Sequence, residues 1–324
     1  GGHTAAIRRF GLPSLLPPDI NLISGPGCPV CVTSIDFIDR LVAYSRLPDT
    51  VIATFGDLVR VPGSLSSLEN ERSAGADVRI VFSGLEALHM AESEPLKTII
   101  FPGIGFETTA PGTAVVVKQA AAMGLKNFLV LSAHKVMPPA MEVVARGSSN
   151  LDGFICPGHV AAITGSDVYR FLPERYRIGC VVSGFEPLDL LQSVLMLVNQ
   201  KNCLKPLVEI QYSRAVTPEG NTKAQRQLIE VFEPCDAIWR GFGTIPGSGL
   251  KIRESFGSFD ADTVIPVDLK STEENKACIC GEILRGIKKP SDCRLFGNVC
   301  TPDNPVGACM VSAEGSCNTF FRYS

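Results

Sequence analysis

Residues 78–134 decide the fold of this chain and read VRIVFSGLEALHMAESEPLKTIIFPGIGFETTAPGTAVVVKQAAAMGLKNFLVLSAH. Short runs of apolar and β-branched residues alternate here with stretches of helical periodicity, and Gly, Pro or Ser stands at most junctions. A strand that is apolar throughout is buried on both faces, so this alternation predicts a parallel sheet with helices on either side. The expected strands are residues 78–82, 98–101 and 128–131, and the expected helices are residues 85–92 and 113–123.

The same alternation continues on both sides of this stretch. Residues 81–88 (VFSGLEAL) resemble residues 181–188 (VVSGFEPL), and each reads as a strand, a Ser-Gly turn and a helix start with Glu in its first turn. We expect an α/β protein with two similar parallel-sheet lobes, with two unrelated strand–helix junctions as the alternative. Further strands are expected at residues 20–24, 50–55, 153–156 and 178–182, and further helices at residues 35–45, 138–145 and 187–199.

Changes in this pattern predict the domain boundaries. The first lobe is expected to comprise residues 1–95 together with 200–265, because a strand at 207–212 is expected to return to it. The second lobe comprises residues 96–199. Residues 266–324 are rich in Cys, Gly, Pro and Asn and lack periodicity, so they cannot bury enough apolar surface alone. We expect this tail to be a small iron–sulfur domain held together by its metal centre.

The composition excludes several classes of protein. Hydrophobic residues make up 45% of the chain and charged residues 19%, which fits a well-buried globular protein rather than a disordered one. The net charge of −3 provides no basic footprint for nucleic acid. No apolar run reaches the roughly 18 residues of a membrane span, and no signal peptide opens the chain. We therefore expect a cytoplasmic protein that binds neither nucleic acid nor membrane.

The chain has 12 cysteines, and cysteine clusters in cytosolic proteins more often bind metal or carry out redox chemistry than form disulfide scaffolds. The tail holds six of them, in a spacing that is not that of a zinc ribbon and in a number above the four that zinc requires. Four could hold an Fe–S cluster while two remain as a dithiol or disulfide, with a zinc site as the alternative. The tail cysteines are Cys278, Cys280, Cys293, Cys300, Cys309 and Cys317.

The segment GPGCPVC at residues 25–31 places Cys28 and Cys31 after an expected strand and before a helix that begins near Ser34. A helix dipole stabilises a thiolate at its N-terminus and lowers the pKa of that thiol. The pair can therefore act as a redox couple or as soft ligands of an iron atom. Half of a structural zinc site is the alternative.

Polar residues follow several expected strands. Asp57, Thr108 and His159 each stand just after one. Ligands of open α/β sheets bind outside the carboxyl ends of the strands, so we expect these side chains to gather near Cys28 and Cys31 in one catalytic cleft. Taken singly, each could instead be a helix cap or a satisfied polar group.

Taken in order along nearly the whole chain, these motifs closely resemble those of the HypD family, maturation factors of [NiFe] hydrogenases. The matching segments are Gly2-His3-Thr4, residues 25–31, Thr54-Phe55-Gly56-Asp57, Arg60-Val61-Pro62-Gly63-Ser64, residues 105–109, Pro157-Gly158-His159-Val160, Gly184-Phe185-Glu186-Pro187 and Cys300-Thr301-Pro302-Asp303-Asn304-Pro305-Val306-Gly307.

The resemblance implies a scaffold and redox factor. With a HypC-type chaperone, such a protein holds the iron on which the Fe(CN)₂CO group is built, and a HypE-type partner donates cyanide as a thiocyanate whose reductive release needs electrons. The family is similar to ferredoxin–thioredoxin reductase around its cluster. That likeness implies Cys278, Cys293, Cys300 and Cys317 as ligands of a [4Fe-4S] cluster, with Cys280 and Cys309 as the neighbouring redox pair.

The chain departs from the family at its start. The family carries a Cys, proposed to hold iron, just before the segment that corresponds to Gly1-Gly2-His3, so we expect an N-terminal segment with this Cys to be missing. Two other functions remain open: a stand-alone ferredoxin-dependent disulfide reductase and a structural zinc protein. A reductase should reduce a generic disulfide alone, whereas a scaffold should require its chaperone.

Overall fold

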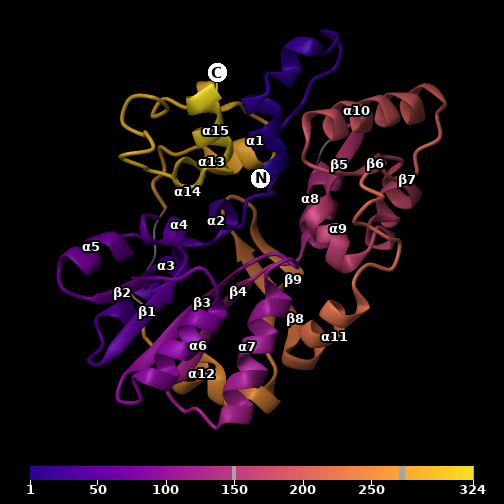
Figure 1. Ribbon diagram of the computed structural model, residues 1–324. Helices are drawn as coiled ribbons and strands as arrows, with labels where there is room; N and C mark the ends of the chain where they lie inside the picture. Colours follow the sequence, from indigo (N-terminus) through magenta and orange to yellow (C-terminus); the bar gives the residue numbers. More distant parts are fainter. Residues whose placement is uncertain (148–150, 270–273, 324) are drawn as a thin grey trace.

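The computed structural model describes residues 1–147, 151–269 and 274–323. It contains one four-stranded sheet, one three-stranded sheet and a two-stranded hairpin, and the cysteine-rich tail packs beside the start of the chain (Figure 1). Both larger sheets are parallel, which confirms the predicted α/β class with parallel sheets. The similarity of two lobes stays a prediction.

The first sheet has the strand order β2-β1-β3-β4. Its strands are buried on both faces, as their continuous apolar sequence predicts. Val51 and Ala53 pack with the helices α6 and α7, whereas Ile52 between them faces the opposite side and packs with α3. The bounds are β1 Thr50–Thr54, β2 Asp77–Ile80, β3 Thr98–Gly105, β4 Phe128–His134, α3 Ile35–Ser45, α6 Gly84–Ser93 and α7 Ala110–Met123.

The boundary expected at residues 95–96 does not coincide with a boundary between sheets. β3 pairs with β1 on one side and β4 on the other, so the first sheet runs well past residue 96. The physical reason is that β3 is buried along nearly its whole length and needs backbone hydrogen-bond partners on both edges. The division of the chain into domains itself stays a prediction.

The second sheet has the order β5-β6-β7 and is covered by α10. The segment expected to return to the first lobe is β7, which instead extends this sheet by pairing with β6, so that expectation is wrong. α10 begins at Pro187, because Pro is well suited to the first helical position, so Glu186 precedes this helix rather than standing in its first turn. The bounds are β5 Gly153–Pro157, β6 Gly179–Ser183, β7 Val208–Ile210 and α10 Pro187–Asn202.

A hairpin of β8 and β9 packs beside β4 and α8, and α11 precedes it in the chain. At its turn end, Arg240 donates its backbone N–H to the carbonyl of Val32, which ties the hairpin to the short helix α2. The bounds are β8 Phe232–Trp239, β9 Gly243–Ile252, α2 Pro29–Val32, α8 Met137–Gly147, α9 Gly158–Thr164, α11 Thr222–Val231, α12 Ala261–Val264, α4 Gly56–Val59 and α5 Leu68–Ser73.

The tail packs against the first residues of the chain. α1 packs against α15 on one side and α10 on the other, and α14 packs against α2 (Figure 1). The strand expected at residues 20–24 does not form, since Ile23 is 48% exposed and the segment has no strand partner. Among the described residues, no helix is both long and apolar enough to span a membrane. The bounds are α1 Gly2–Arg9, α13 Cys280–Leu284, α14 Ala308–Val311 and α15 Ser316–Tyr323.

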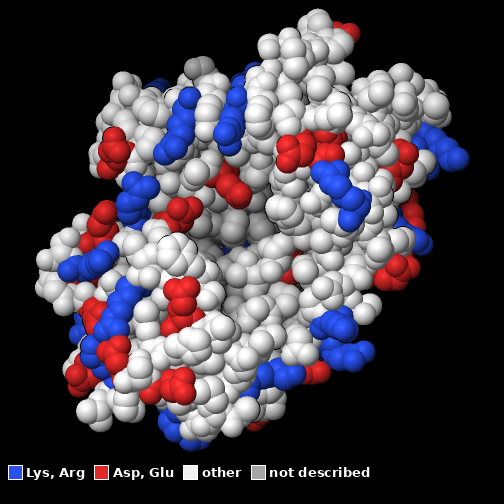
Figure 2. All heavy atoms as spheres, in the orientation of Figure 1, with Lys and Arg blue, Asp and Glu red and all other residues white. Residues whose placement is uncertain are grey.

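The outer face shown in Figure 2 is hollowed where the first sheet, the second sheet and the tail meet. Basic and acidic side chains are interspersed over this face rather than gathered by sign. The hollow adjoins the elements that carry the candidate site residues.

Candidate functional site

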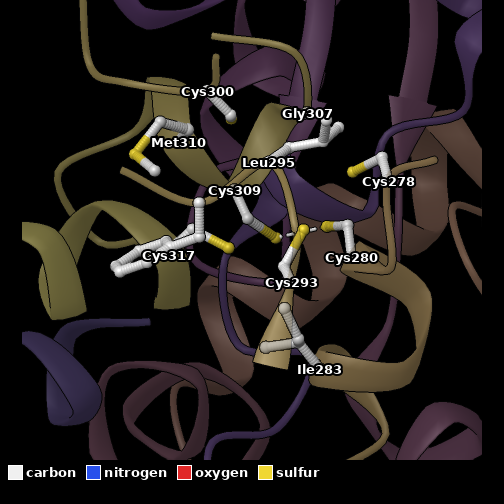
Figure 3. A pocket seen from close by; sticks show the side chains of 11 residues that line it. Cys278, Cys280, Ile283, Cys293, Leu295, Cys300, Gly307, Cys309, Met310 and Cys317 are labelled. Atoms are coloured by element: carbon white, nitrogen blue, oxygen red, sulfur yellow. Dashed lines mark hydrogen bonds between the residues drawn. The ribbon is translucent and has the colours of Figure 1, made fainter. Parts of the chain in front are cut away.

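All six tail cysteines line one pocket, and the rest of its wall is largely apolar (Figure 3). The tail places them on short elements: Cys280 opens α13, Cys309 lies in α14 and Cys317 lies in α15. The other lining residues are Ile283, Leu295, Phe296, Gly307 and Met310. Such a set of thiols in an apolar wall suits a soft metal centre.

Cys280 and Cys309 are in direct contact in this pocket. Their sulfur atoms lie 2.7 Å apart, and the two residues are 5% and 1% exposed. Two thiols this close can be oxidised to a disulfide with little movement of the chain. The pocket thus combines a paired dithiol with four further thiols.

Burial and hydrogen bonds between thiols raise the pKa of three thiols in the pocket, Cys278, Cys280 and Cys317. Burial is the main cause that raises the pKa of Cys317 above its usual range. A hydrogen bond with Cys280, together with burial, raises the pKa of Cys278. For Cys280, the hydrogen bond with Cys278 lowers the pKa, but the one with Cys309 and burial outweigh it. Metal ligands must lose their thiol protons, so loading of the pocket should release protons.

Backbone groups of residues 306 and 307 lie directly against the sulfur atoms. The Val306 N–H points at Cys300 Sγ at 3.4 Å, the kind of N–H···S contact that orients a metal-binding sulfur. A Cβ added to Gly307 would lie 2.7 Å from Cys278 Sγ. Only glycine fits there without displacing the thiol.

This close approach makes Gly307→Ala a test of metal loading. In the metal-free protein Cys278 can rotate away from the new methyl group, so we expect nearly normal folding. A sulfur held by a metal cannot rotate, so iron affinity should fall by about tenfold or more. Iron per chain after anaerobic reconstitution measures the effect. Gly257→Ala is the matched control, because its Cβ meets nothing within 4 Å. Equal iron in both variants would contradict a metal at Cys278.

The six thiols line one pocket but are not arranged as a ready-made site for a single metal ion. Within residues 1–147, 151–269 and 274–323, no group of three or more His, Cys, Asp or Glu is arranged to hold a single metal ion. The fit to a cluster therefore rests on the donor set itself, six sulfurs around one apolar pocket, of which a [4Fe-4S] cluster requires four.

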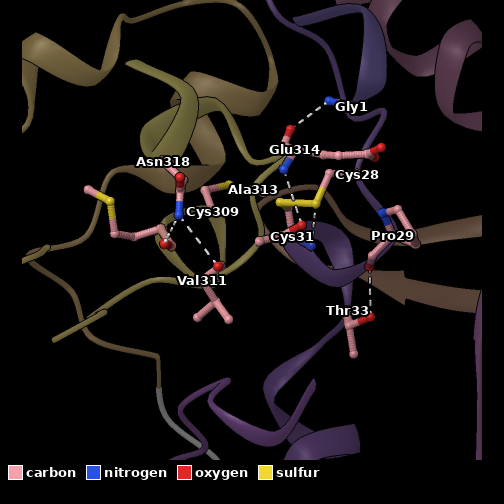
Figure 4. Close-up of a disulfide and its surroundings, with 12 residues drawn as sticks. Gly1, Cys28, Pro29, Cys31, Thr33, Cys309, Val311, Ala313, Glu314 and Asn318 are labelled. Carbon is pink, nitrogen blue, oxygen red and sulfur yellow. Dashed lines mark hydrogen bonds between the residues drawn. A yellow bond between two sulfur atoms is a disulfide. The ribbon is translucent and has the colours of Figure 1, made fainter. Parts of the chain in front are cut away.

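Cys28 and Cys31 are joined as a disulfide at the start of α2, with their Cα atoms 5.3 Å apart. Both are buried, and they belong to the same hydrophobic core cluster as Cys280 and Cys309. Because α14 packs against α2, the disulfide lies beside the tail segment around Cys309 and Ala313 (Figure 4). The two thiol pairs, far apart in the sequence, are thus neighbours in one buried region.

The three polar residues expected in a cleft lie on two different sheets. Asp57 follows β1 and Thr108 follows β3, which are adjacent strands of the first sheet, and both side chains are exposed. His159 is also exposed but follows β5 of the second sheet. Whether these side chains act together with Cys28 and Cys31 stays a prediction.

An aromatic stack connects His159 with the start of the chain. The ring of Phe185 stacks on His159 at 3.9 Å and on His3 at 4.4 Å. His3 Nε2 lies 3.0 Å from the Gly184 carbonyl, a contact in which the nitrogen must donate. Burial lowers the pKa of His3 to about 4, so this imidazole is neutral. The spacing of residues in the sequence assigned no role to His3. The residue was noted only because it belongs to Gly2-His3-Thr4, one of the segments that match the family.

The sequence did not predict that three charged residues are buried. Burial raises the pKa of Glu107 to about 7; its Oε1 accepts from the Met137 N–H at 2.9 Å. Burial lowers the pKa of Lys135 to about 8; its Nζ donates to the Ile238 carbonyl. Arg240 is 7% exposed and lies beside the tail. Nothing in their local sequence predicts burial, because it results from contacts between distant elements.

The fold and the site define an α/β protein with a cysteine-lined pocket that adjoins a buried dithiol–disulfide pair. A family model described as HypD, hydrogenase formation hypA family, matches residues 1–324. The HypD hydrogenase maturation factor of Azotobacter vinelandii is 49% identical over 331 residues, covering 100% of this chain and 87% of that protein. The chain belongs to the HypD family of hydrogenase maturation factors.

Two further relatives are similar over the whole length of this chain. The HypD maturation factor of Escherichia coli K12 is 42% identical over 327 residues, covering 100% of this chain and 87% of that protein. A putative hydrogenase expression/formation protein of Methanocaldococcus jannaschii is 46% identical over 323 residues, covering 100% of this chain and 90% of that protein. The family predicted from the motifs is thereby confirmed.

Proposed function

We propose that this protein is a cytoplasmic scaffold and redox factor that assembles the Fe(CN)₂CO group of [NiFe] hydrogenase. It acts with a HypC-type chaperone and a HypE-type cyanide donor. The observation that carries the proposal is the burial of two thiol pairs, Cys28–Cys31 and Cys280–Cys309, in one core cluster beside a pocket lined by further thiols.

The pocket fits a [4Fe-4S] cluster held by Cys278, Cys293, Cys300 and Cys317, within a tail domain of residues 266–324. When bound, the cluster supplies electrons one at a time. Cys280 and Cys309 can store two electrons as a dithiol, because their sulfur atoms are already in contact at 2.7 Å.

Thiol–disulfide exchange then moves both electrons to the Cys28–Cys31 pair. A thiolate of the tail pair attacks the Cys28–Cys31 disulfide, forming a mixed disulfide that the second tail thiol resolves. The products are a Cys280–Cys309 disulfide and two thiols at Cys28 and Cys31, with no net gain or loss of electrons or protons. The packing of α14 on α2 keeps the required movement small.

The reduced Cys28–Cys31 pair serves the iron cargo. Soft thiolates suit iron that carries strong ligands, and a thiolate from the chaperone can share this iron and later carry it away. Asp57, Thr108 and His159 are proposed to line the same cleft, with His159 oriented by its stack on Phe185. Cys28 and Cys31 return to the disulfide as their two electrons break the S–C bond of the partner's thiocyanate, which leaves a thiol on the partner and releases cyanide to the iron.

Analysis of iron and acid-labile sulfide in the anaerobically prepared protein tests this proposal. We expect about four iron atoms and four sulfides per chain. A content of about one zinc and no sulfide would contradict it and support a structural zinc protein. Cys203→Ser, which alters an exposed thiol outside the tail, should have the wild-type content.

A further inference from the structure

We propose that Arg240 sets the reduction potential of the cysteine-lined pocket by placing a buried positive charge beside Cys278 and Cys280. The inference rests on the proposed function, since it concerns the cluster held by these thiols. It assigns a role to a residue outside the cysteine motifs, at the end of the β8–β9 hairpin.

The backbone around Arg240 is locked between the two thiol-bearing elements. The Arg240 N–H donates to the carbonyl of Val32 at 2.9 Å, which fixes the residue at the end of α2. The next residue, Gly241, has a φ of 81°, and a Cβ there would lie 2.3 Å from the Cα of Gly281. This close contact seats the hairpin on the first turn of α13, directly after Cys280.

The charge of Arg240 is only partly compensated. Its side chain is 7% exposed, and its Nε donates to Glu274 Oε1 at 3.2 Å, but the Glu274 side chain is 48% exposed. Its Nη1 is buried and has no hydrogen-bond partner among the described residues. Burying an unpaired donor of a charged group is costly, so the site fits an anionic group that is added later.

The sulfur atoms of the pocket are the groups on which this charge acts. The Gly241 backbone contacts the backbone of Gly281, and Gly281 directly follows Cys280, so the buried charge of Arg240 lies next to the chain segment that carries this thiol. A cation that favours thiolate over thiol also favours the more negative, reduced form of a thiolate-bound cluster. The effect is strong where water does not screen it.

Arg240 should therefore raise the potential at which the pocket accepts an electron, since net charge is one of the factors that set cluster potentials. The backbone contacts of Arg240 do not involve its side chain. A side-chain substitution can thus remove the charge and leave the attachment of the hairpin to α2 and α13 in place.

The test is an anaerobic redox titration of the reconstituted full chain, followed by absorbance and electron paramagnetic resonance. Arg240→Gln should reduce the ratio of reduced to oxidised cluster at a fixed potential about tenfold, which is about 59 mV for one electron. Arg240→Lys, which keeps the charge, should stay closer to wild type. Arg285→Gln is the matched control, because Arg285 is an exposed cation at the end of α13 where water screens its charge.

Normal iron and sulfide in Arg240→Gln, with a midpoint no lower than that of Arg285→Gln, would overturn the inference. If Arg240→Gln does not retain the cluster, the midpoint potential of the Glu274→Gln variant tests the inference instead. Removing this half-exposed carboxylate leaves Arg240 less compensated, so the midpoint should rise, and an unchanged midpoint would count against Arg240. Absence of iron and sulfide from the wild-type protein would instead refute the cluster itself, so the two failures are distinguishable.

Discussion

Cys280→Ser and Cys309→Ser should each abolish hydrogenase maturation while leaving the iron content of the protein near that of wild type. Serine has nearly the shape of cysteine but cannot form a disulfide, so either change prevents the pair from storing two electrons. The measurements are hydrogenase activity in a complemented maturation-deficient strain and iron per purified chain. Cys203→Ser serves as the control, because that thiol is exposed and lies outside the tail.

The state of the Cys28–Cys31 disulfide gives a second measurement of this effect. Alkylation and mass spectrometry after addition of a one-electron reductant should show reduced Cys28 and Cys31 in the wild type but not in the two variants. Normal maturation by both variants would show that the Cys280–Cys309 pair does not pass electrons to Cys28 and Cys31. The metal centre would then only stabilise the fold of the tail. Reduction of a generic protein disulfide without the chaperone would favour the stand-alone reductase instead.

Cys293→Ser and Cys300→Ser should differ from these variants in their iron content. Each removes a proposed cluster ligand, so iron and sulfide should be lost together with maturation. The tail has little apolar core of its own, and losing a tightly bound group should lower the melting temperature by roughly 5–10 °C. Metal analysis and calorimetry measure the two effects. Retention of full iron by either variant would show that the ligands are assigned wrongly among the six thiols.

The strands of both parallel sheets could largely be predicted from the sequence. Apolar runs at residues 50–55, 98–101 and 128–131 became β1, β3 and β4, because burial on both faces imposes a continuous apolar pattern that is visible locally. Residues 20–24 were also predicted to be a strand but form none, and Ile23 is 48% exposed. The sequence did not reveal which strands share a sheet. For example, the strand expected to return to the first lobe is β7, which pairs with β6 of the second sheet.

By itself the sequence determined the α/β class, the family and the set of cysteines, because residue type, periodicity and motif order are properties of the chain read along its length. Only the tertiary structure decided which thiols meet. Cys280 and Cys309 are 29 positions apart, yet their sulfur atoms are in contact. The burial of Arg240 likewise depends on Gly241 meeting Gly281 across the hairpin and the tail. Such contacts depend on how separate elements pack, and local sequence does not encode that packing in a form that can be read one segment at a time.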